Sequence, residues 1–235
     1  MAREQISKTI VTAQSFMPSF GRYEWVRIFV PGFFFALLLE LFFAAFLTRY
    51  VLFAPGPLLH VLVFLGVALT AGLTMYAKET PKRRRAFQEN QPSQYLSAKA
   101  RTMKSIELLD DTEARRLYFY ILNNHIPPIF HEKIFFFGTV YHIMVQIRRT
   151  SFWYAVAGTL AVLFQLSSGM TLADQQPLMV FTPVIWILYV LNIRYNKADR
   201  QMQENYQDQI FWLQMNNDLV ESTLRKRQAA PPPEP

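Results

Sequence analysis

Five polar side chains lie inside or at the edges of long apolar stretches of this sequence: Glu40, His60, Gln165, Ser167 and Ser168. At a rise of about 1.5 Å per residue, Glu40 lies roughly 18 Å along a helix from Ile28, and Gln165 lies roughly 21 Å from Ser151. These similar depths predict one polar cluster. The two serines are expected one turn above it, and His60 is expected to approach from the outer end of its own stretch.

A cluster of this kind has two chemical interpretations. An acid deep in a membrane is costly and must face protein or water, so Glu40 can line a pathway for cations or protons. Alternatively, a protonated Glu40 holds helices together through a hydrogen bond to Gln165 or to a neighbouring subunit, a contact worth about 1 kcal/mol. The sequence leaves both interpretations open.

Four apolar stretches reach or approach the roughly 20 residues that a helix needs to cross a bilayer: Ile28–Leu47, Pro57–Ala77, Ser151–Leu172 and Leu178–Ile193. Short turns at 54–57 and 173–177 join them in pairs. The sequence therefore predicts an all-α integral membrane protein with four transmembrane helices in two hairpins. A cytoplasmic helical segment is expected between the hairpins, and a cytoplasmic helix is expected after them.

Small residues spaced by four occur within two of these stretches. Ala68 and Gly72 lie in the second, and Ala157 and Ala161 lie in the third. Such pairs permit neighbouring helices to approach closely.

The basic residues predict how the hairpins are oriented. Of the 24 Lys and Arg residues, only Arg49 lies near a short turn between paired stretches. The others precede the first stretch, fall between the hairpins or follow the last stretch. Positively charged segments stay in the cytoplasm, so the N-terminus, the C-terminus and the central segment are all expected there.

Several basic residues cluster beside the ends of the apolar stretches: Lys82, Arg83, Arg84, Arg85, Arg148 and Arg149. The formal net charge of the chain is +7. Because these charges lie where a helix leaves the membrane, they favour contact with anionic lipid headgroups. Lipid is therefore an expected partner, and direct binding of nucleic acid is not expected.

The expected division of the chain has six parts. They are a cytoplasmic segment at 1–27, a hairpin at 28–77, a cytoplasmic helical segment at 78–150, a hairpin at 151–195, an amphipathic or coiled-coil helix at 196–227, and a disordered tail at 228–235.

The segment at 78–150 contains several helix signals. Helical periodicity predicts a helix from about Tyr95 to Leu109, and Asp110 or Asp111 can cap the next helix. That helix is expected to end before the two prolines at 127–128, where another begins. The apolar run Ile134–Ile147 covers only about 14 residues, which is short for a crossing. It is expected as an interfacial helix against the inner face of the membrane, with a re-entrant segment as the alternative.

The tail carries an apolar repeat with alternating spacings of four and three: Tyr206, Ile210, Leu213, Asn217, Val220 and Leu224. This spacing is typical of a coiled coil, and an Asn within the seam specifies register and oligomer state. The stripe therefore predicts self-association. The alternative is an amphipathic helix that packs on the central segment of its own chain.

Motifs for enzymatic chemistry are missing from the sequence. The chain has no cysteine, and its four histidines form no zinc motif. It has no glycine-rich phosphate loop and no nucleophile elbow. No cofactor, metal or catalytic activity is therefore expected.

The leading functional hypothesis is a homo-oligomeric inner-membrane protein that acts as a channel or perturbs the membrane under the control of its cytoplasmic helices. Its layout is similar to that of small membrane effectors in bacterial defence systems, a resemblance of organisation alone. The alternative is a membrane-anchored scaffold that recruits a soluble partner. A third hypothesis, a small lipid-modifying enzyme, requires His131 or His142 as a working residue.

Overall fold

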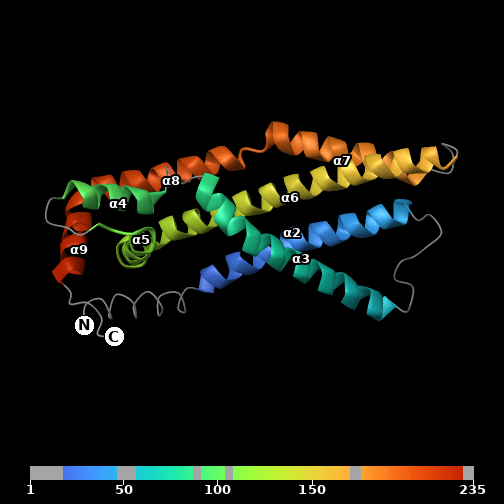
Figure 1. Cartoon of the computed structure of the whole chain (residues 1–235). Coiled ribbons are helices and arrows are strands. Elements are labelled where there is room, and N and C mark those ends of the chain that lie inside the picture. Colours follow the sequence, from blue (N-terminus) through green and yellow to red (C-terminus); the bar gives the residue numbers. More distant parts are fainter. Residues whose placement is uncertain (1–17, 47–56, 87–90, 104–107, 170–175, 230–235) are drawn as a thin grey trace. The chain divides into compact units, whose positions relative to one another are not determined.

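The computed structural model of the chain describes residues 18–46, 57–86, 91–103, 108–169 and 176–229 (Figure 1). These residues form helices and short connections, and none of them forms a strand. The helices are α2 (Pro18–Phe46), α3 (Pro57–Ala86), α4 (Pro92–Thr102), α5 (Asp111–His125), α6 (Pro128–Ser167), α7 (Gln176–Tyr195), α8 (Ala198–Met215) and α9 (Asn217–Ala229). The predicted all-α class is confirmed. The expected disordered tail lies mostly outside the described residues.

Four stretches of helix are long and apolar enough to cross a membrane: Gly21–Phe46, Leu58–Lys78, Phe130–Ser167 and Gln176–Met215. Each of them overlaps one of the four apolar stretches predicted from the sequence. The number of membrane-compatible helices therefore agrees with the prediction, while the orientation of the chain stays a prediction.

Helix α6 differs from the expected arrangement. The run Ile134–Ile147 was expected as an interfacial helix distinct from the span that begins at Ser151, but both belong to one 40-residue helix. No proline follows Pro128 within α6, so hydropathy changes along the helix while nothing in its backbone stops it. A helix of this length measures about 60 Å, roughly twice the thickness of a hydrocarbon core.

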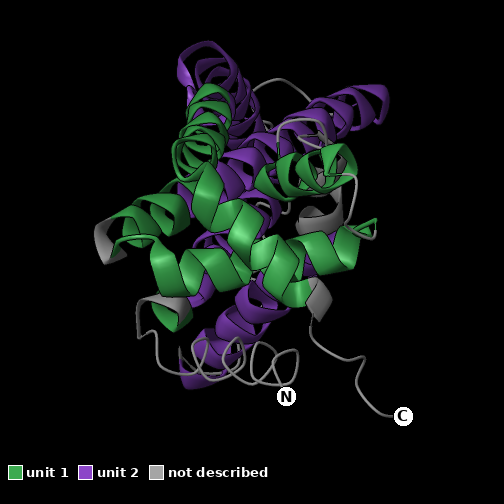
Figure 2. Cartoon of the chain, turned by 90° about the vertical axis from the view of Figure 1, so that its left-hand side faces the viewer, with its two compact units in different colours: residues 1–23, 82–138, 200–235 green, residues 24–81, 139–199 purple. Residues whose placement is uncertain are grey.

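The chain divides into two compact units, coloured separately in Figure 2. Unit 1 contains residues 1–23, 82–138 and 200–235, and unit 2 contains residues 24–81 and 139–199. The boundaries fall within α2, α3, α6 and α8, so these helices contribute to both units. Each unit is therefore assembled from segments that are far apart in the sequence.

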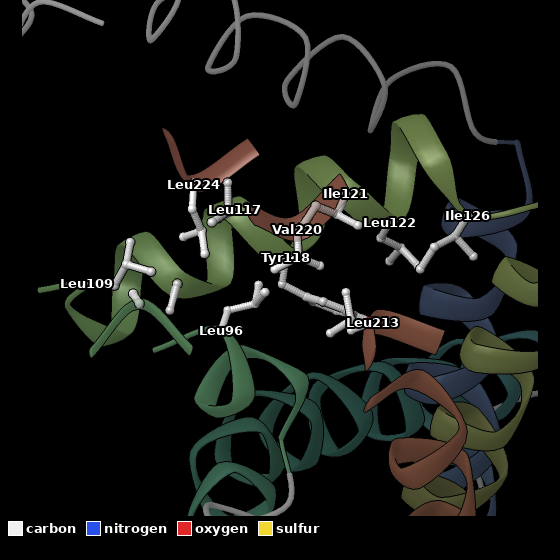
Figure 3. Close-up of a cluster of buried hydrophobic side chains, with 12 residues drawn as sticks. Leu96, Leu109, Leu117, Tyr118, Ile121, Leu122, Ile126, Leu213, Val220 and Leu224 are labelled. Atoms are coloured by element: carbon white, nitrogen blue, oxygen red, sulfur yellow. The ribbon is translucent and has the colours of Figure 1, made fainter. Parts of the chain in front are cut away.

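Unit 1 encloses its own hydrophobic core, shown in Figure 3. Helices α4, α5, α8 and α9 all contribute to it, through residues that include Leu96, Ile121, Leu213 and Leu224. Helix α5 begins with a capping box at Asp110, one of the two capping residues that the sequence predicted. Asp110 accepts a hydrogen bond from the backbone of Glu113, whose side chain accepts one from the backbone of Asp110. This cap fixes where the central helix of the core starts.

Unit 2 depends on a close crossing of α2 and α3. A Cβ atom placed on Gly32 would overlap the carbonyl oxygen of Ala68, and one on Gly72 would overlap the carbonyl oxygen of Ile28. The two backbones therefore touch at both points, which only glycine permits. The Ala68 and Gly72 pair lies at a helix contact, as its spacing predicted.

Helices α6 and α7 also approach closely in unit 2. A Cβ on Gly158 would lie 2.6 Å from the Oγ1 atom of Thr182. A cluster of buried side chains that includes Leu38, Tyr154 and Phe181 joins α2 to this pair. Three of the four apolar helices thus share one packed interior.

The close crossing of α2 and α3 predicts that a larger residue at position 32 destabilises the protein. Gly32→Ala should destabilise the protein by about 2 kcal/mol, because the added methyl group forces two backbones apart. Gly21→Ala is the matched control, since it is the same change in the same helix and no atom of the described residues lies within 4 Å of the added atom. Thermal unfolding in detergent should show a lowered midpoint for Gly32→Ala and an unchanged or slightly raised one for the control. Equal midpoints would contradict the crossing.

Candidate functional site

The candidate site in unit 2 is a pair of polar side chains from α2 and α3. Atom Oε1 of Glu40 lies 3.1 Å from Nε2 of His60. Their side chains keep 41% and 30% of their surface exposed, respectively. The pair is a direct contact between a carboxylate and an imidazole within two otherwise apolar helices, so it can bind or relay a proton.

The helix crossing places these two residues opposite each other. Glu40 follows Gly32 by eight residues, and His60 precedes Ala68 by eight residues. Because the two helices run in opposite directions, both residues lie about 12 Å from the crossing, on the same side of it. The Gly32 contact with Ala68 therefore sets the register that brings Glu40 to His60.

The pair lies towards one end of both helices. Helix α2 begins at Pro18, ten residues before the expected start of the span, and ends at Phe46. Glu40 is thus about 9 Å from the end of its helix, and His60 is about 4 Å from the start of α3. The depth counted from Ile28 had placed Glu40 nearer the middle.

The other three members of the predicted cluster form hydrogen bonds with other partners. The side-chain amide of Gln165 donates a hydrogen bond to the carbonyl of Phe46 at 3.2 Å. The hydroxyls of Ser167 and Ser168 donate to the carbonyl of Phe164 in their own helix. Residue counting along a helix gives a level but not a direction, so side chains at similar depths can point to different neighbours. Of the five predicted residues, the described contacts join Glu40 to His60 and give the other three hydrogen bonds elsewhere.

Sequence analysis missed a second group of polar residues, on α6. Thr139, His142, Gln146 and Thr150 are all buried in unit 2 and recur at spacings of three and four, which places them on one face of the helix. This periodicity is visible in the sequence. The mean hydropathy of the run does not show it, because apolar residues lie between the polar ones.

This polar face of α6 contacts both α2 and α3. The guanidinium of Arg27 is buried, donates to the Oγ1 atom of Thr139 at 3.0 Å and pairs with Glu24 at 3.3 Å. The ring of His142 meets that of Tyr76 edge to face at 5.9 Å. These contacts fix the first hairpin to α6 by hydrogen bonding and ring packing.

The basic residues expected at lipid headgroups have different surroundings. Arg148 forms an ion pair with Asp199 at 3.1 Å, and Arg149 is partly buried. Residues 82–85 lie in the last turns of α3, whereas the sequence had placed them beyond the helix. The ion pair of Arg148 offsets the positive charge that it was expected to present to lipid.

The tail does not form the single helix that its repeat predicted. Helix α8 ends at Met215 and α9 begins at Asn217. Leu213, Val220 and Leu224 are fully buried in the core of unit 1, while Tyr206 and Ile210 are partly exposed. Half of the apolar repeat therefore packs against its own chain. The alternative interpretation of the sequence, an amphipathic helix on its own central segment, described this kind of packing.

Asn217 has a local role in this arrangement. Its side-chain amide donates to the carboxylate of Glu221 at 2.9 Å, one turn further along α9. Lys99 of α4 reaches the same carboxylate at 2.9 Å. The hydrogen bonds from Lys99 and Asn217 hold the pKa of Glu221 below its ordinary value.

A second ion pair attaches α9 to α5, and a buried hydrogen bond attaches α8 to α5. Arg227 contacts Glu113 at 2.6 Å. The hydroxyl of Tyr118 donates to the side-chain oxygen of Gln209 inside the core, and burial raises the pKa of that hydroxyl far above its ordinary value. Together with the Lys99 contact, these interactions position both tail helices within unit 1.

The side chains required by the enzymatic hypothesis are enclosed. His131 and His142 are both buried. Among the described residues, no group of three or more His, Asp or Glu side chains is arranged to hold a metal ion. In the described structure, the imidazoles of His131 and His142 are therefore not accessible to a lipid substrate.

Comparison of the chain with protein-family models, with curated proteins and with solved structures found no match in any of the three.

The contacts of Glu221 predict how stability depends on pH. Because its pKa is lower in the folded chain than the ordinary value of 4.5, its contribution is present above that value and is lost as the pH falls through the folded pKa. Between pH 7 and pH 3, the thermal midpoint should therefore fall further for the wild type than for Glu221→Gln. The exposed Glu132 provides a control, Glu132→Gln, for the loss of one surface carboxylate. Parallel curves for the wild type and Glu221→Gln would contradict the assignment.

Proposed function

We propose that the protein is a membrane-anchored scaffold, in which the apolar helices hold the chain in a bilayer and unit 1 recruits a soluble protein partner. The bilayer proposed is a bacterial inner membrane, with both termini and unit 1 on the cytoplasmic side. The recruitment of a defence protein is one form that this function can take.

The observation that carries the proposal is the outer surface of α8. Phe211 and Met215 lie one turn apart on this helix, with 63% and 70% of their surface exposed. Leu213, between them, is buried in the core of unit 1. Unit 1 thus closes its own core and still presents a Phe and a Met side chain, two residue types that are enriched at protein interfaces.

A photo-crosslinking amino acid at position 211 tests the proposal in the full-length protein in native membranes. It should capture one soluble protein, and Met215→Ser in the same chain should reduce that capture by about tenfold, because it removes half of the apolar contact. The control places the same amino acid at position 225, where Arg225 is exposed on α9. Capture of lipid at position 211, or equal capture at both positions, would overturn the scaffold.

A channel-like or membrane-perturbing effector is the second candidate function. The Glu40 contact with His60 favours it, because a proton-binding pair in an apolar helical hairpin is the kind of group that lines an ion pathway. The described part of one chain offers four membrane-compatible helices for such a pathway, so conduction requires several copies.

Ion flux through reconstituted protein tests this second function. Glu40→Gln and His60→Gln should each lower cation or proton flux into liposomes by about tenfold, a change equivalent to roughly 1.4 kcal/mol in the barrier. Ser168→Ala is the control, because its hydroxyl donates only to its own helix among the described contacts. A flux that is absent from the wild type, or unchanged in both variants, would leave the scaffold as the better hypothesis.

A further inference from the structure

Four helices of unit 2 each have one end at a common level. Helix α2 ends at Phe46, α3 begins at Pro57, α6 ends at Ser167 and α7 begins at Gln176. These four ends lie on the same side of the unit (Figure 1). The level therefore sets one limit of the region that a bilayer can surround.

A second level lies about 30 Å away, which is the thickness of a hydrocarbon core. At a rise of about 1.5 Å per residue, a count of about 29 to 33 Å from each of the four ends leads to Trp25, Tyr76, Val145 and Tyr195. Three of these four residues carry aromatic rings. On α2, α3 and α7, the thickness of a bilayer thus ends at an aromatic residue.

The glycine crossing gives the same level on α2 and α3. Trp25 precedes Gly32 by seven residues, and Tyr76 follows Ala68 by eight. Gly32 meets the backbone of Ala68, and the two helices run in opposite directions. Both aromatic residues therefore lie about 11 Å from the crossing, on the same side of it. This agreement does not depend on the thickness of a bilayer.

Ring contacts extend the level to α6 and α7. The ring of Tyr76 meets that of His142 on α6 at 5.9 Å. Further along α6, the rings of Phe152 and Tyr189 lie 5.3 Å apart and join α6 to α7. The position six residues before Phe152 is one turn from His142, and the residue six positions beyond Tyr189 is Tyr195. The four helices therefore reach this level within about one turn of each other.

The side chains at this level suit the boundary between hydrocarbon and headgroups. Trp25 and Tyr195 are 56% and 72% exposed. Lys78, Arg194 and Lys197 are exposed as well, and no ion pair within the described part of the chain involves them. Amphipathic rings are enriched at this depth of a membrane, and basic side chains extend towards the headgroups from it.

The acidic side chains near this level leave its positive charge in place. Glu24 pairs with Arg27 at 3.3 Å, and Asp199 pairs with Arg148 at 3.1 Å. Glu79 adds one further acid to the sequence, against the three cations that have no described ion pair. The level is therefore complementary in charge to anionic lipid.

Exposed apolar side chains begin directly at this level. Along α2, Trp25 is followed at intervals of four by Phe29, Phe33, Leu37 and Leu41, which are between 39% and 51% exposed. The ring of Trp25 stacks on that of Phe29 at 5.4 Å. An apolar surface that starts at a tryptophan and continues along the helix is suited to lipid tails with headgroups at its start.

We propose that unit 2 leaves the hydrocarbon at a boundary band, and that the basic side chains of this band bind the headgroups of anionic phospholipids. The boundary band consists of Trp25, Tyr76, Lys78, Arg194, Tyr195 and Lys197. Ammonium and guanidinium groups donate strong hydrogen bonds to the phosphate oxygens of such headgroups. The inference rests on the membrane anchoring in the proposed function and is independent of the partner of unit 1.

The boundary band also divides helix α6. The helix passes this level between His142 and Val145, so its earlier turns lie outside the hydrocarbon and its later turns lie within it. The sequence had offered an interfacial or a re-entrant segment for Ile134–Ile147. The boundary band instead lets this run cross the interface as part of one helix. A helix of about 60 Å is thereby accommodated, because only part of it has to fit the bilayer.

Spin labels at single cysteines test the position of the band, because the natural chain has no cysteine. Trp153→Cys and Ile187→Cys replace residues that are 67% and 58% exposed. Each lies eight residues from the band, so both labels should lie about 12 Å inside the hydrocarbon. Their depth is measured in the full-length protein in phosphatidylglycerol-containing liposomes, from collisions with oxygen and with a polar nickel reagent. A span that begins at Ser151 would instead keep the label at position 153 near the headgroups.

The possible outcomes separate this inference from the proposed function. Equal, deep positions of the two labels are the expected result. A shallow label at position 153 beside a deep one at position 187 would overturn the boundary on α6. Free access of the nickel reagent to both labels would remove the membrane anchoring itself, and the proposed function with it.

Lipid selectivity tests the headgroup contact. Replacing all three basic residues of the boundary band with Gln should lower the preference of the protein for spin-labelled phosphatidylglycerol over spin-labelled phosphatidylcholine by about fivefold. The control removes the same charge from exposed positions of unit 1, through Arg101→Gln, Arg116→Gln and Arg225→Gln. It should keep the preference of the wild type. An unchanged preference in the band variant, or an equal loss in both variants, would overturn the binding of headgroups by the band.

Discussion

The direct contact between the backbones of α2 and α3 is the constraint on which the candidate site of unit 2 depends. Two glycines, Gly32 and Gly72, each face a carbonyl group of the other helix. Because no side chain separates the helices there, they cannot slide past each other without a clash. The antiparallel register is thereby set, and Glu40 meets His60 as a consequence of it.

The two units place their polar contacts in different ways. Unit 1 closes an apolar core and surrounds it with ion pairs such as Lys99 with Glu221 and Arg227 with Glu113. Unit 2 instead carries apolar side chains on its outside and places polar contacts inside, including Arg27 with Thr139. This inversion is what a bilayer demands of the part of a protein that it surrounds.

The two candidate functions make different use of these units. A scaffold needs a stable unit 1 with an accessible surface, and α8 offers one at Phe211 and Met215. Conduction needs polar groups in unit 2 and more than one copy.

The sequence by itself determined the helical class, the number of apolar helices and the capped start of α5, because hydropathy, periodicity and capping are properties of neighbouring residues. It did not determine which polar residues meet. Depth along a helix placed Gln165 beside Glu40, but the direction of each side chain and the register of the crossing decided that Glu40 pairs with His60. Likewise, the spacing of Leu213, Val220 and Leu224 predicted a buried face without identifying what buries it. Only the tertiary structure decided that the core of unit 1 does so, because an apolar face packs equally well on its own chain or on another.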